Sequence, residues 1–376
     1  MNILIVTPDY PDDRRAKYQF VKELVSAFAR CGHRCYVISP YNILKNRSCA
    51  PYLRDESGVQ VCRPKFLSLS TLRVADISLS YVLQKRALSK ALLRMDFRPD
   101  VVYAHFWKAA EWVYDYARDH QLPLFVASGE SEIAKMFDMT RLNKAFADYV
   151  SGVICVSNKN REESVALGLT TEEKCAVFPN AVDRSLFRKM DRSQCRKELG
   201  FPQNAYIIAF VGAFCERKGS KRLSSAIKMV KDRTVYSVFV GSGSEEPTCD
   251  HVLFKGTLPH TDIPKVLNAS DVFVLPTLHE GCCNAVVEAL ACGLPVISSD
   301  LPFNWDILHA DNALLVDPQC VEEIAAAISR LSDEGIRQRL AENALASVAS
   351  LSIEARAEQI LHFMNDRMGT LNASAV

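Results

Sequence analysis

The sequence predicts an α/β protein made of two doubly wound parallel sheets in tandem. Short, wholly apolar runs alternate with amphipathic helical stretches, which is typical of parallel α/β layers. The alternation starts at residues 2–7 and begins again at residues 206–212, after a turn-rich bend at residues 179–183. We therefore expect one domain over residues 1–182 and a second over residues 183–351.

The elements of the first domain follow directly from this alternation. A helix expected near residues 17–31 ends before Gly32, which occupies the usual C-cap position. A last helix at about residues 352–376 is expected to pack back onto the first domain. The expected strands of this domain lie at 2–7, 35–39, 101–104, 123–127 and 152–156.

The second domain is expected to contain strands at 206–212, 235–240, 252–255, 272–276 and 295–298, with helices between them. In doubly wound sheets, ligands bind beyond the carboxyl ends of the strands. The polar and glycine residues at those ends are therefore the candidate site residues. They include His105, 128–132, 212–219, 241–244 and 280–284.

Composition narrows the class of protein. A length of 376 residues suits two domains, and a formal net charge of +1 argues against a nucleic-acid partner. The 13 cysteines are scattered without a C-x-x-C pair, which is typical of reduced cytosolic cysteines and indicates no metal site. No apolar run is long enough for a signal peptide or a membrane span. We expect a cytoplasmic protein.

The segment 279–299 carries the strongest chemical signal. Glu280 precedes a turn of small residues, a short helix expected at 285–292 and a second carboxylate, Glu288. A turn that leads into a helix N-terminus presents backbone N–H groups suited to a pyrophosphate, and Asn284 is the expected N-cap. Carboxylates accept hydrogen bonds from vicinal hydroxyls. Together these features predict a nucleotide-sugar pocket.

With these motifs in place, the chain resembles the retaining glycosyltransferases of family four over nearly its whole length. The resemblance rests on the order of Gly32-His33, the 179–183 bend, Val211-Gly212 with Lys218-Gly219, Val240-Gly241-Ser242-Gly243, and Glu280 followed by Glu288. It implies the GT-B architecture, in which two Rossmann-like domains face each other across a cleft.

The resemblance also implies a function. The expected reaction is a metal-independent, retaining, hexosyltransferase-like transfer from a nucleotide sugar to a hydroxyl of a glycan or lipid-linked acceptor. UDP is favoured over GDP, no cofactor is required, and bacterial surface-polysaccharide synthesis is the expected setting. The donor is expected on residues 183–351 and the acceptor on residues 1–182.

Residue roles are carried over from the family's motifs. Glu280 would contact the sugar hydroxyls, Glu288 the ribose hydroxyls, and Lys218 the diphosphate, whose charge grows as the glycosidic bond breaks. Cys282 and Cys283 are expected to pack and to shape the sugar pocket; the alternative is a nucleophile of lowered pKa. The remaining expected donor contacts are Gly212, Arg217, Gly241, Gly256, Thr257, Leu258, Gly281, Asn284, Ala285 and Val286.

Three departures from the family pattern leave roles open. The usual arginine after the glycine is Ala213, so either one cation suffices or Arg217 or Arg222 supplies the second. Ser128-Gly129-Glu130 replaces a common His-Gly, which makes His105 and Glu130 the remaining catalytic candidates of the first domain, each against a purely structural role. The charged first loop, 8–15, would recognise an anionic acceptor through Arg14 and Arg15.

Residues 45–98 hold 11 basic and 4 acidic residues beside apolar ones, so this stretch is either a peripheral membrane contact or a solvated helix face. Two other functions also stay open. One is a non-catalytic nucleotide-sugar-binding or assembly subunit. The other is a different enzyme, either a GT-B epimerase or a nucleotide-dependent oxidoreductase. The oxidoreductase is disfavoured because Gly241-Ser242-Gly243 lacks the third glycine of a dinucleotide fingerprint.

Overall fold

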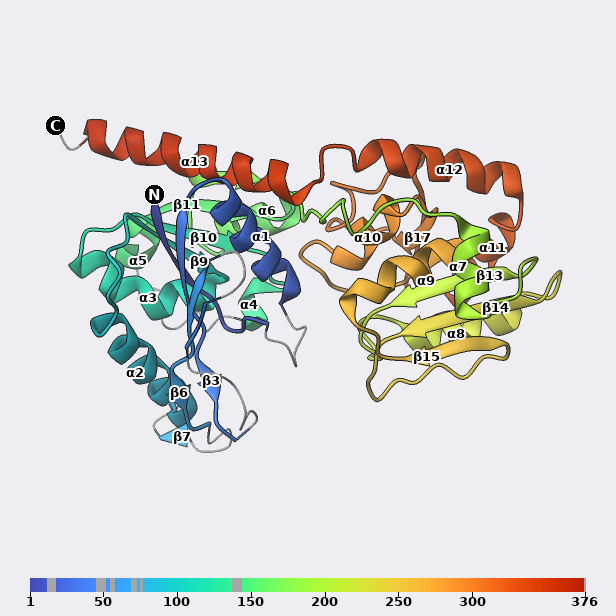
Figure 1. Ribbon diagram of the computed structural model, residues 1–376, viewed down its shortest axis with the longest axis horizontal. Helices are drawn as coiled ribbons and strands as arrows, with labels where there is room; N and C mark the ends of the chain where they lie inside the picture. Colours follow the sequence, from blue (N-terminus) through green and yellow to red (C-terminus); the bar gives the residue numbers. More distant parts are fainter. Residues whose placement is uncertain are drawn as a thin grey trace. The chain divides into compact units, whose positions relative to one another are not determined.

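The computed structural model describes residues 1–11, 18–44, 52–54, 58–68, 73–74, 77–136 and 144–374 (Figure 1). The chain divides into two compact units. Unit 1 comprises Met1–Phe178 with Arg356–Val376, and unit 2 comprises Pro179–Ala355. The boundaries therefore fall at Phe178 and Arg356, each within a few residues of the positions that the sequence predicts, 182 and 352.

Unit 1 is built on an eight-stranded sheet of order β12-β11-β10-β9-β1-β2-β5-β4. Its strands run parallel, except that β4 is antiparallel to β5. The central strands are buried and apolar, as expected for a sheet covered on both faces. The strands of this sheet are β1 Asn2–Val6, β2 Arg34–Ile38, β4 Tyr52–Arg54, β5 Gln60–Cys62, β9 Val101–His105, β10 Leu124–Ser128, β11 Val150–Cys155 and β12 Cys175–Val177. Two separate short pairs are formed by β3 Tyr41–Asn42 with β6 Lys65–Phe66, and by β7 Arg73–Val74 with β8 Ile77–Ser78.

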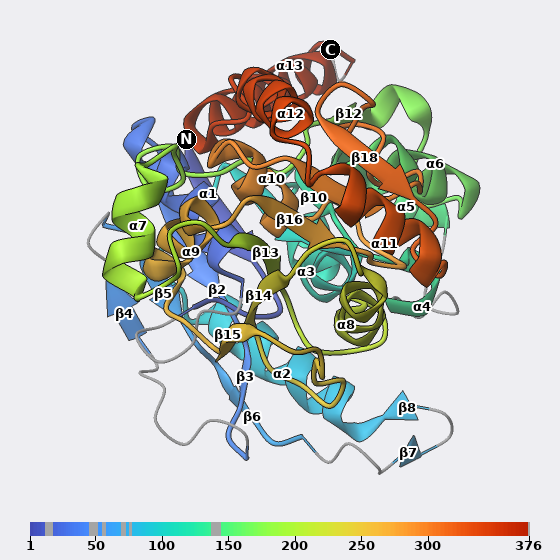
Figure 2. The ribbon, with the colours of Figure 1, turned by 90° about the vertical axis from the view of Figure 1, so that its right-hand side faces the viewer.

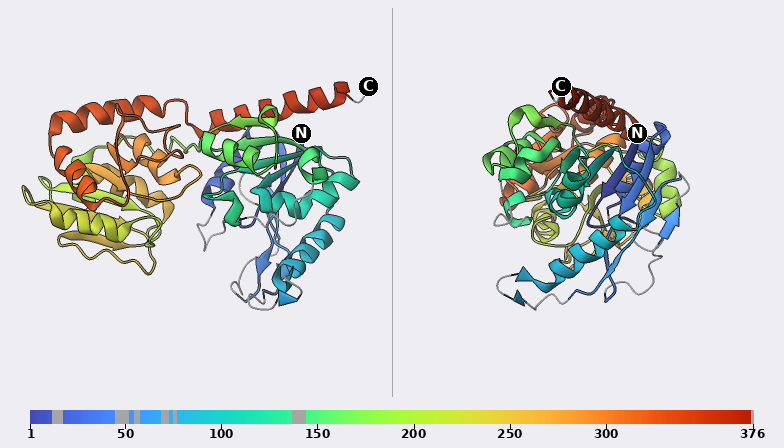
Figure 3. Two further views of the ribbon diagram at one scale, coloured as in Figure 1. Left: turned by 180° about the vertical axis from the view of Figure 1, so that it is seen from behind. Right: turned by 90° about the vertical axis from the view of Figure 1, so that its left-hand side faces the viewer.

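Helices cover both faces of this sheet (Figure 3). One core cluster joins β1, β2, β9 and β10 to the buried sides of α2 and α3. On another part of the sheet, Phe363 of α13 packs its ring against Phe125 of β10, and Arg367 Nε donates to the carbonyl of Ser151 at 3.0 Å. The helices are α1 Gln19–Arg30, α2 Leu79–Leu93, α3 Trp107–Asp119, α4 Ile133–Met136, α5 Lys144–Tyr149, α6 Asn158–Ala166, the 3₁₀ turn η2 Glu172–Lys174, and α13 Ile353–Ser374.

Unit 2 is built on a six-stranded, all-parallel sheet of order β15-β14-β13-β16-β17-β18 (Figure 2). With β13 counted as the first strand this is the order 3-2-1-4-5-6 of the Rossmann fold. The order reverses between β13 and β16, and ligands bind at such a switch point. The strand bounds are β13 Tyr206–Val211, β14 Val235–Val240, β15 Val252–Gly256, β16 Val272–Leu275, β17 Val296–Ser299 and β18 Ala313–Val316.

The helices of unit 2 form two groups. One group is α8 with α11. In the other, α9 contacts α7 and α10, and α10 also contacts α12. A buried ion pair ties α7 to the sheet. Asp271, just before β16, accepts from Arg196 NH2 at 2.7 Å and from the Ile207 backbone N–H at 2.8 Å. Because Asp271 precedes β16 and also bonds to the backbone of β13, this ion pair holds the starts of these two neighbouring strands together. The helices are α7 Arg192–Leu199, α8 Ser220–Met229, the 3₁₀ turn η3 His260–Asp262, α9 Ile263–Ala269, α10 Asn284–Ala291, α11 Val321–Arg330 and α12 Glu334–Ser347.

Candidate functional site

The carboxyl ends of β13, β14 and β15 are joined by glycines. The Gly212 N–H bonds to the Val240 carbonyl at 2.9 Å, and the Gly241 N–H bonds to the Gly256 carbonyl at 2.8 Å. Gly241 has φ 153°, and a Cβ there would lie 1.9 Å from the Gly212 carbonyl oxygen. Only glycine therefore allows the two strand ends to approach each other this closely. Thr257 and Leu258 follow directly, the first exposed and the second half-buried.

Across the switch point, the loop after β16 leads into α10. Gly281, Cys282 and Cys283 are buried, and the Asn180 side-chain amide donates to the Cys282 carbonyl at 2.9 Å. The expected capping is wrong. Cys283 is the N-cap and makes no side-chain capping bond, whereas Asn284 is the first helical residue. The Asn284 side chain does not cap because it already lies inside the helix. Ala285 is half-buried and Val286 is fully buried.

Lys218 and Glu280 meet at the switch point. Lys218 Nζ lies 2.6 Å from Glu280 Oε1, and each side chain is 12% exposed. Arg217 NH1 reaches the same oxygen at 2.5 Å, and the Thr277 hydroxyl donates to it at 2.9 Å. Burial opposes the charge of Lys218, but the neighbouring Cys283 and Glu280 outweigh burial and raise its pKa. The cluster therefore holds a charged ammonium beside a carboxylate.

The structure locates the second cation. Ala213 is exposed and carries no charge, while Arg217 from the same loop pairs with Glu280. Arg222 instead donates from NH2 to the Pro276 carbonyl at 2.8 Å. Of the two arginines considered from the sequence, Arg217 is the one that lies in the Lys218 and Glu280 cluster.

Glu288 is held by a residue that sequence reasoning missed. His260 Nε2 lies 3.0 Å from Glu288 Oε1, and Glu288 is 8% exposed. The Phe187 ring packs against the imidazole, with centroids 5.1 Å apart. In the sequence, the one indication that His260 lies near the site was its position shortly after the strand end at Gly256. Its pairing with a residue 28 positions later depends on tertiary structure.

The two adjacent cysteines are both buried, and Cys283 is not activated. Burial raises the pKa of Cys283, which is 3% exposed, and its Sγ accepts from Lys218 Nζ at 3.5 Å. Cys282 is 8% exposed. A thiol with a raised pKa is a poor nucleophile near neutral pH. The geometry therefore favours the packing role over the alternative of a low-pKa nucleophile.

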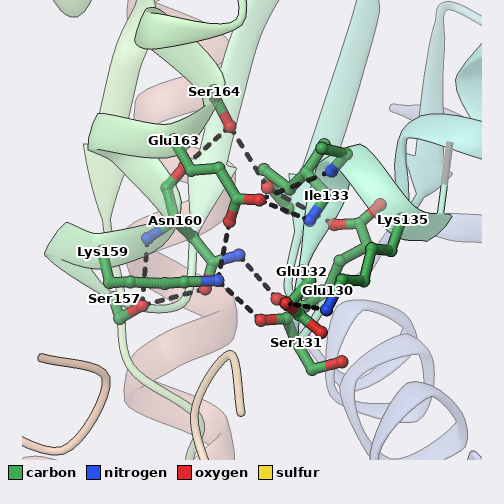
Figure 4. A network of polar contacts seen from close by, with 12 residues as sticks. Glu130, Ser131, Glu132, Ile133, Lys135, Ser157, Lys159, Asn160, Glu163 and Ser164 are labelled. Carbon is green, nitrogen blue, oxygen red and sulfur yellow. Dashed lines mark hydrogen bonds and ion pairs between the residues drawn. The ribbon is translucent and has the colours of Figure 1, made fainter. Parts of the chain in front are cut away.

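In unit 1, Glu130 caps a helix that is remote in sequence. Its Oε1 accepts from the Trp107 N–H at 2.8 Å, and its Oε2 accepts from the Gly129 N–H at 3.0 Å. Burial raises the pKa of Glu130 to about 7, although these backbone donors favour the charged form. The Asn160 side chain of α6 donates to the Glu130 carbonyl at 2.9 Å, within the network of Figure 4. Glu130 thus has a structural role, and its catalytic role stays a prediction.

His105 ends β9 and is 4% exposed. Its ring lies between Phe106 and Phe20, at centroid distances of 4.6 and 5.4 Å. Burial, together with nearby Arg356, lowers the pKa of His105 to about 3, so the imidazole is neutral. Its expected contact with an acceptor stays a prediction. Arg14 and Arg15 lie outside the described residues.

Within the described ranges, no cluster of three histidine, cysteine, aspartate or glutamate side chains is arranged to hold a metal ion. The helices in that part of the chain include none that is both long and apolar enough to cross a membrane.

Two Rossmann-like units, the second of which brings Lys218 and Glu280 together at its switch point, are the architecture of the GT-B glycosyltransferases. A family model described as "Glycosyl transferases group 1" matches residues 191–346, and one described as "Glycosyltransferase Family 4" matches residues 19–186. The chain therefore belongs to the family-four glycosyltransferases, which confirms the resemblance and the GT-B fold predicted from the sequence.

Known relatives agree with this assignment. The chain is 28% identical over 365 residues to TuaC of Bacillus subtilis (strain 168), whose name assigns it to teichuronic acid biosynthesis; the match covers 89% of this chain and 90% of the relative. It is also 28% identical over 209 residues to the UDP-Gal:alpha-D-GlcNAc-diphosphoundecaprenol alpha-1,3-galactosyltransferase of Escherichia coli, covering 51% of this chain and 54% of that protein.

Solved structures share the fold. Sucrose-phosphate synthase of Thermosynechococcus elongatus has a TM-score of 0.81 at 19% identity, covering 98% of this chain and 100% of that chain. HepE of Anabaena, in complex with UDP-glucose, has a TM-score of 0.75 at 18% identity, covering 97% and 99%.

The raised pKa of Glu130 predicts a pH-dependent stability for unit 1. A folded pKa of about 7, above the ordinary 4.5, means that stability is complete below about pH 4.5 and is lost as pH rises through 7. The loss in the free energy of unfolding is roughly 3 kcal/mol, because each pH unit between the two pKa values is worth about 1.4 kcal/mol. In Glu130→Gln, the free energy of unfolding should not show this loss. It can be measured by urea unfolding with Trp107 and Trp112 fluorescence as the signal. Glu132→Gln, which removes a carboxylate paired with exposed Lys135, is the control and should keep the loss. An unchanged pH profile in Glu130→Gln would contradict the assignment.

Proposed function

We propose that this glycosyltransferase moves a sugar, with retention of anomeric configuration, from a nucleotide sugar to a hydroxyl of a glycan or lipid-linked acceptor. The observation that carries the proposal is the cluster of Lys218, Arg217 and Glu280 at the switch point of unit 2. UDP is the favoured nucleotide, since HepE is a structural neighbour solved with UDP-glucose. Polysaccharide or glycoconjugate synthesis is the favoured setting, since the names of TuaC and the galactosyltransferase point there.

The donor would lie across the carboxyl edge of the unit 2 sheet. The diphosphate would take the two cations away from Glu280 and approach the backbone at Gly212 and Gly241. The loop from Gly281 to Val286 would supply backbone N–H groups at the start of α10. The freed Glu280 carboxylate would then accept hydrogen bonds from the sugar hydroxyls.

The nucleoside would bind farther along the same edge. Glu288, with one oxygen already held by His260, would accept from the ribose hydroxyls. The backbone groups of Gly256, Thr257 and Leu258 would contact the base. This arrangement assigns the diphosphate to the ends of β13 and β14, the ribose to Glu288 of α10, and the base to the end of β15.

The chemistry needs no protein nucleophile. As the bond from the anomeric carbon to the leaving phosphate oxygen breaks, the acceptor oxygen attacks the same face, and its proton passes to the leaving phosphate. Lys218 and Arg217 would stabilise the negative charge that develops there, so the mechanism requires no metal. Acceptor groups would be positioned by unit 1, with His105 and Glu130 as the candidate residues.

A non-catalytic nucleotide-sugar-binding subunit is the second candidate, because Ala213 and Ser128 depart from the family pattern. A GT-B epimerase is a third. Incubation with radiolabelled UDP-sugars separates them. Transfer or slow donor hydrolysis supports the transferase, a new UDP-sugar supports the epimerase, and binding without turnover supports the subunit.

Single substitutions test the cation–carboxylate cluster. Lys218→Ala and Glu280→Ala should each lower kcat roughly 100-fold or more, the size of one lost transition-state contact. Arg217→Ala should lower it less, because its side chain is more exposed, at 39%; adding A213R, which restores the family cation, should recover part of the loss. Lys221→Ala, at an exposed pair with Glu245, is the matched control. Wild-type kcat in both principal variants would refute the site.

His260 should affect nucleotide affinity more than chemistry. His260→Ala leaves Glu288 without its partner, so the Kd for UDP, measured by calorimetry, should rise roughly 10-fold, in line with a lost hydrogen bond to a charged group of about 1.5 kcal/mol. His260→Gln, which can still donate at the Nε2 position, should recover most of the affinity. Equal Kd values for wild type and His260→Ala would exclude the role.

We also propose a peripheral membrane contact through α2. Leu88 and Leu92 face the core, while Arg86, Lys90 and Leu93 are exposed, Leu93 at 79%. Basic residues beside an exposed leucine suit an anionic lipid surface. Residues 45–51 and other parts of the basic stretch lie outside the described ranges, so the proposal rests on α2.

Vesicle flotation tests this contact. The wild type should float with phosphatidylglycerol vesicles at low salt and not with phosphatidylcholine vesicles. Arg86→Ala with Lys90→Ala should weaken binding about 30-fold, from about 1 kcal/mol per basic residue. Lys228→Ala with Lys231→Ala, the same charge change at exposed positions of unit 2, is the control. Binding that ignores lipid charge would refute the proposal.

A further inference from the structure

The carboxyl edge of the unit 2 sheet continues past the Glu280 loop. The order β13-β16-β17 places the loop after β17, residues 300–312, next to the loop after β16 that carries Glu280. Adjacent strands lie about 4.8 Å apart, so the two loops are neighbours. The loop after β17 lies on the side away from β14 and β15, whose ends are assigned above to the nucleotide. It therefore borders the sugar end of the donor site.

Trp305 is exposed on this loop. Its side chain is a large apolar residue at 53% exposure, whereas Trp107 and Trp112 of unit 1 are at 0% and 2%. Leaving half an indole in water forgoes the stabilisation that its burial would give. The indole N–H donates to Asp300 Oδ1 at 2.8 Å, which fixes the direction of the ring. Aromatic side chains that are exposed and held in one orientation are typical of binding surfaces.

Hydrogen bonds connect the Trp305 loop to Glu280. The side-chain amide of buried Asn304, the neighbour of Trp305, donates to the Ser299 carbonyl at 2.8 Å. The Ser299 hydroxyl donates to the Thr277 carbonyl at 2.5 Å. The Thr277 hydroxyl in turn donates to Glu280 Oε1 at 2.9 Å. These bonds tie Asn304, the residue before Trp305, to the carboxylate assigned to the sugar, while the indole itself bonds to Asp300.

We propose that Trp305 is a stacking platform for a pyranose ring at the sugar end of the donor site. One face of a pyranose presents C–H groups, and an indole offers a flat apolar surface with little conformational entropy to lose. The ring belongs either to the transferred sugar or to the acceptor. The inference rests on the proposed function, since it uses the assignment of Glu280 to the sugar.

The fluorescence of Trp305 provides a direct test. Because the other two tryptophans are buried, acrylamide should quench mainly Trp305, and Trp305→Phe should remove the quenchable signal. UDP-glucose, UDP-galactose and UDP-N-acetylglucosamine should be compared with UDP alone. Protection by a UDP-sugar beyond that by UDP identifies the donor sugar as the stacked ring. Protection only by methyl glycosides or oligosaccharides, added with UDP, identifies the acceptor.

Turnover gives a second readout. Trp305→Ala should lower kcat/KM roughly 10-fold while leaving the Kd of UDP and the Tm unchanged, and Trp305→Phe should keep most of the activity. If UDP binds but no sugar protects Trp305 and Trp305→Ala has normal kcat/KM, the stacking role is overturned and the proposed function stands. If UDP and UDP-sugars fail to bind the wild type, the proposed function fails with it.

Discussion

The single oxygen Oε1 of Glu280 organises the candidate site. It accepts from Lys218, Arg217 and Thr277, which come from the two loops that follow β13 and β16. A buried ammonium is costly without a counter-charge, so the carboxylate is what allows Lys218 to remain charged at 12% exposure. A diphosphate has the same sign as the carboxylate and more charge. Exchange of the cations from Glu280 to the diphosphate would therefore couple donor binding to the release of Glu280 toward the sugar.

This exchange depends on a backbone constraint. Gly212 and Gly241 bring two strand ends so close that a Cβ at Gly241 would overlap the carbonyl of Gly212. A Cβ at Gly212 would instead lie 3.5 Å from the aliphatic chain of Lys218, which packs over this glycine. Glycine is therefore required at Gly241 for the close packing of the strand ends, whereas a Cβ at Gly212 would be in ordinary contact with Lys218.

Much of the fold was predictable because each strand of a doubly wound sheet is a local, wholly apolar run. Glu280, Glu288 and Lys218 were predictable because each lies next to such a strand end or the helix that follows it. His260 and Trp305 were not predictable. The role of His260 depends on Glu288, which is remote in sequence, and that of Trp305 depends on its exposure in the folded chain. Asn284 was assigned as a cap because its residue type favours that position, but a helix that starts one residue earlier moves the cap to Cys283. In the sequence, Glu130 was a catalytic candidate weighed against a structural role, and only the fold brings the Trp107 N–H to it.

The two units differ in the charges that they offer to a reaction. In unit 2 the candidate residues are an ammonium, a guanidinium and two carboxylates. In unit 1, burial leaves His105 with a pKa of about 3, and both oxygens of Glu130 already accept from backbone N–H groups. An imidazole with so low a pKa is a weak base. Glu130, with a pKa of about 7, can take a proton near neutral pH, but protonation would weaken the bonds that it accepts at the helix N-terminus. Proton transfer to the leaving phosphate, as proposed above, would leave those bonds of unit 1 intact. The distribution of charge between the units therefore favours transfer of the acceptor's proton to the departing diphosphate.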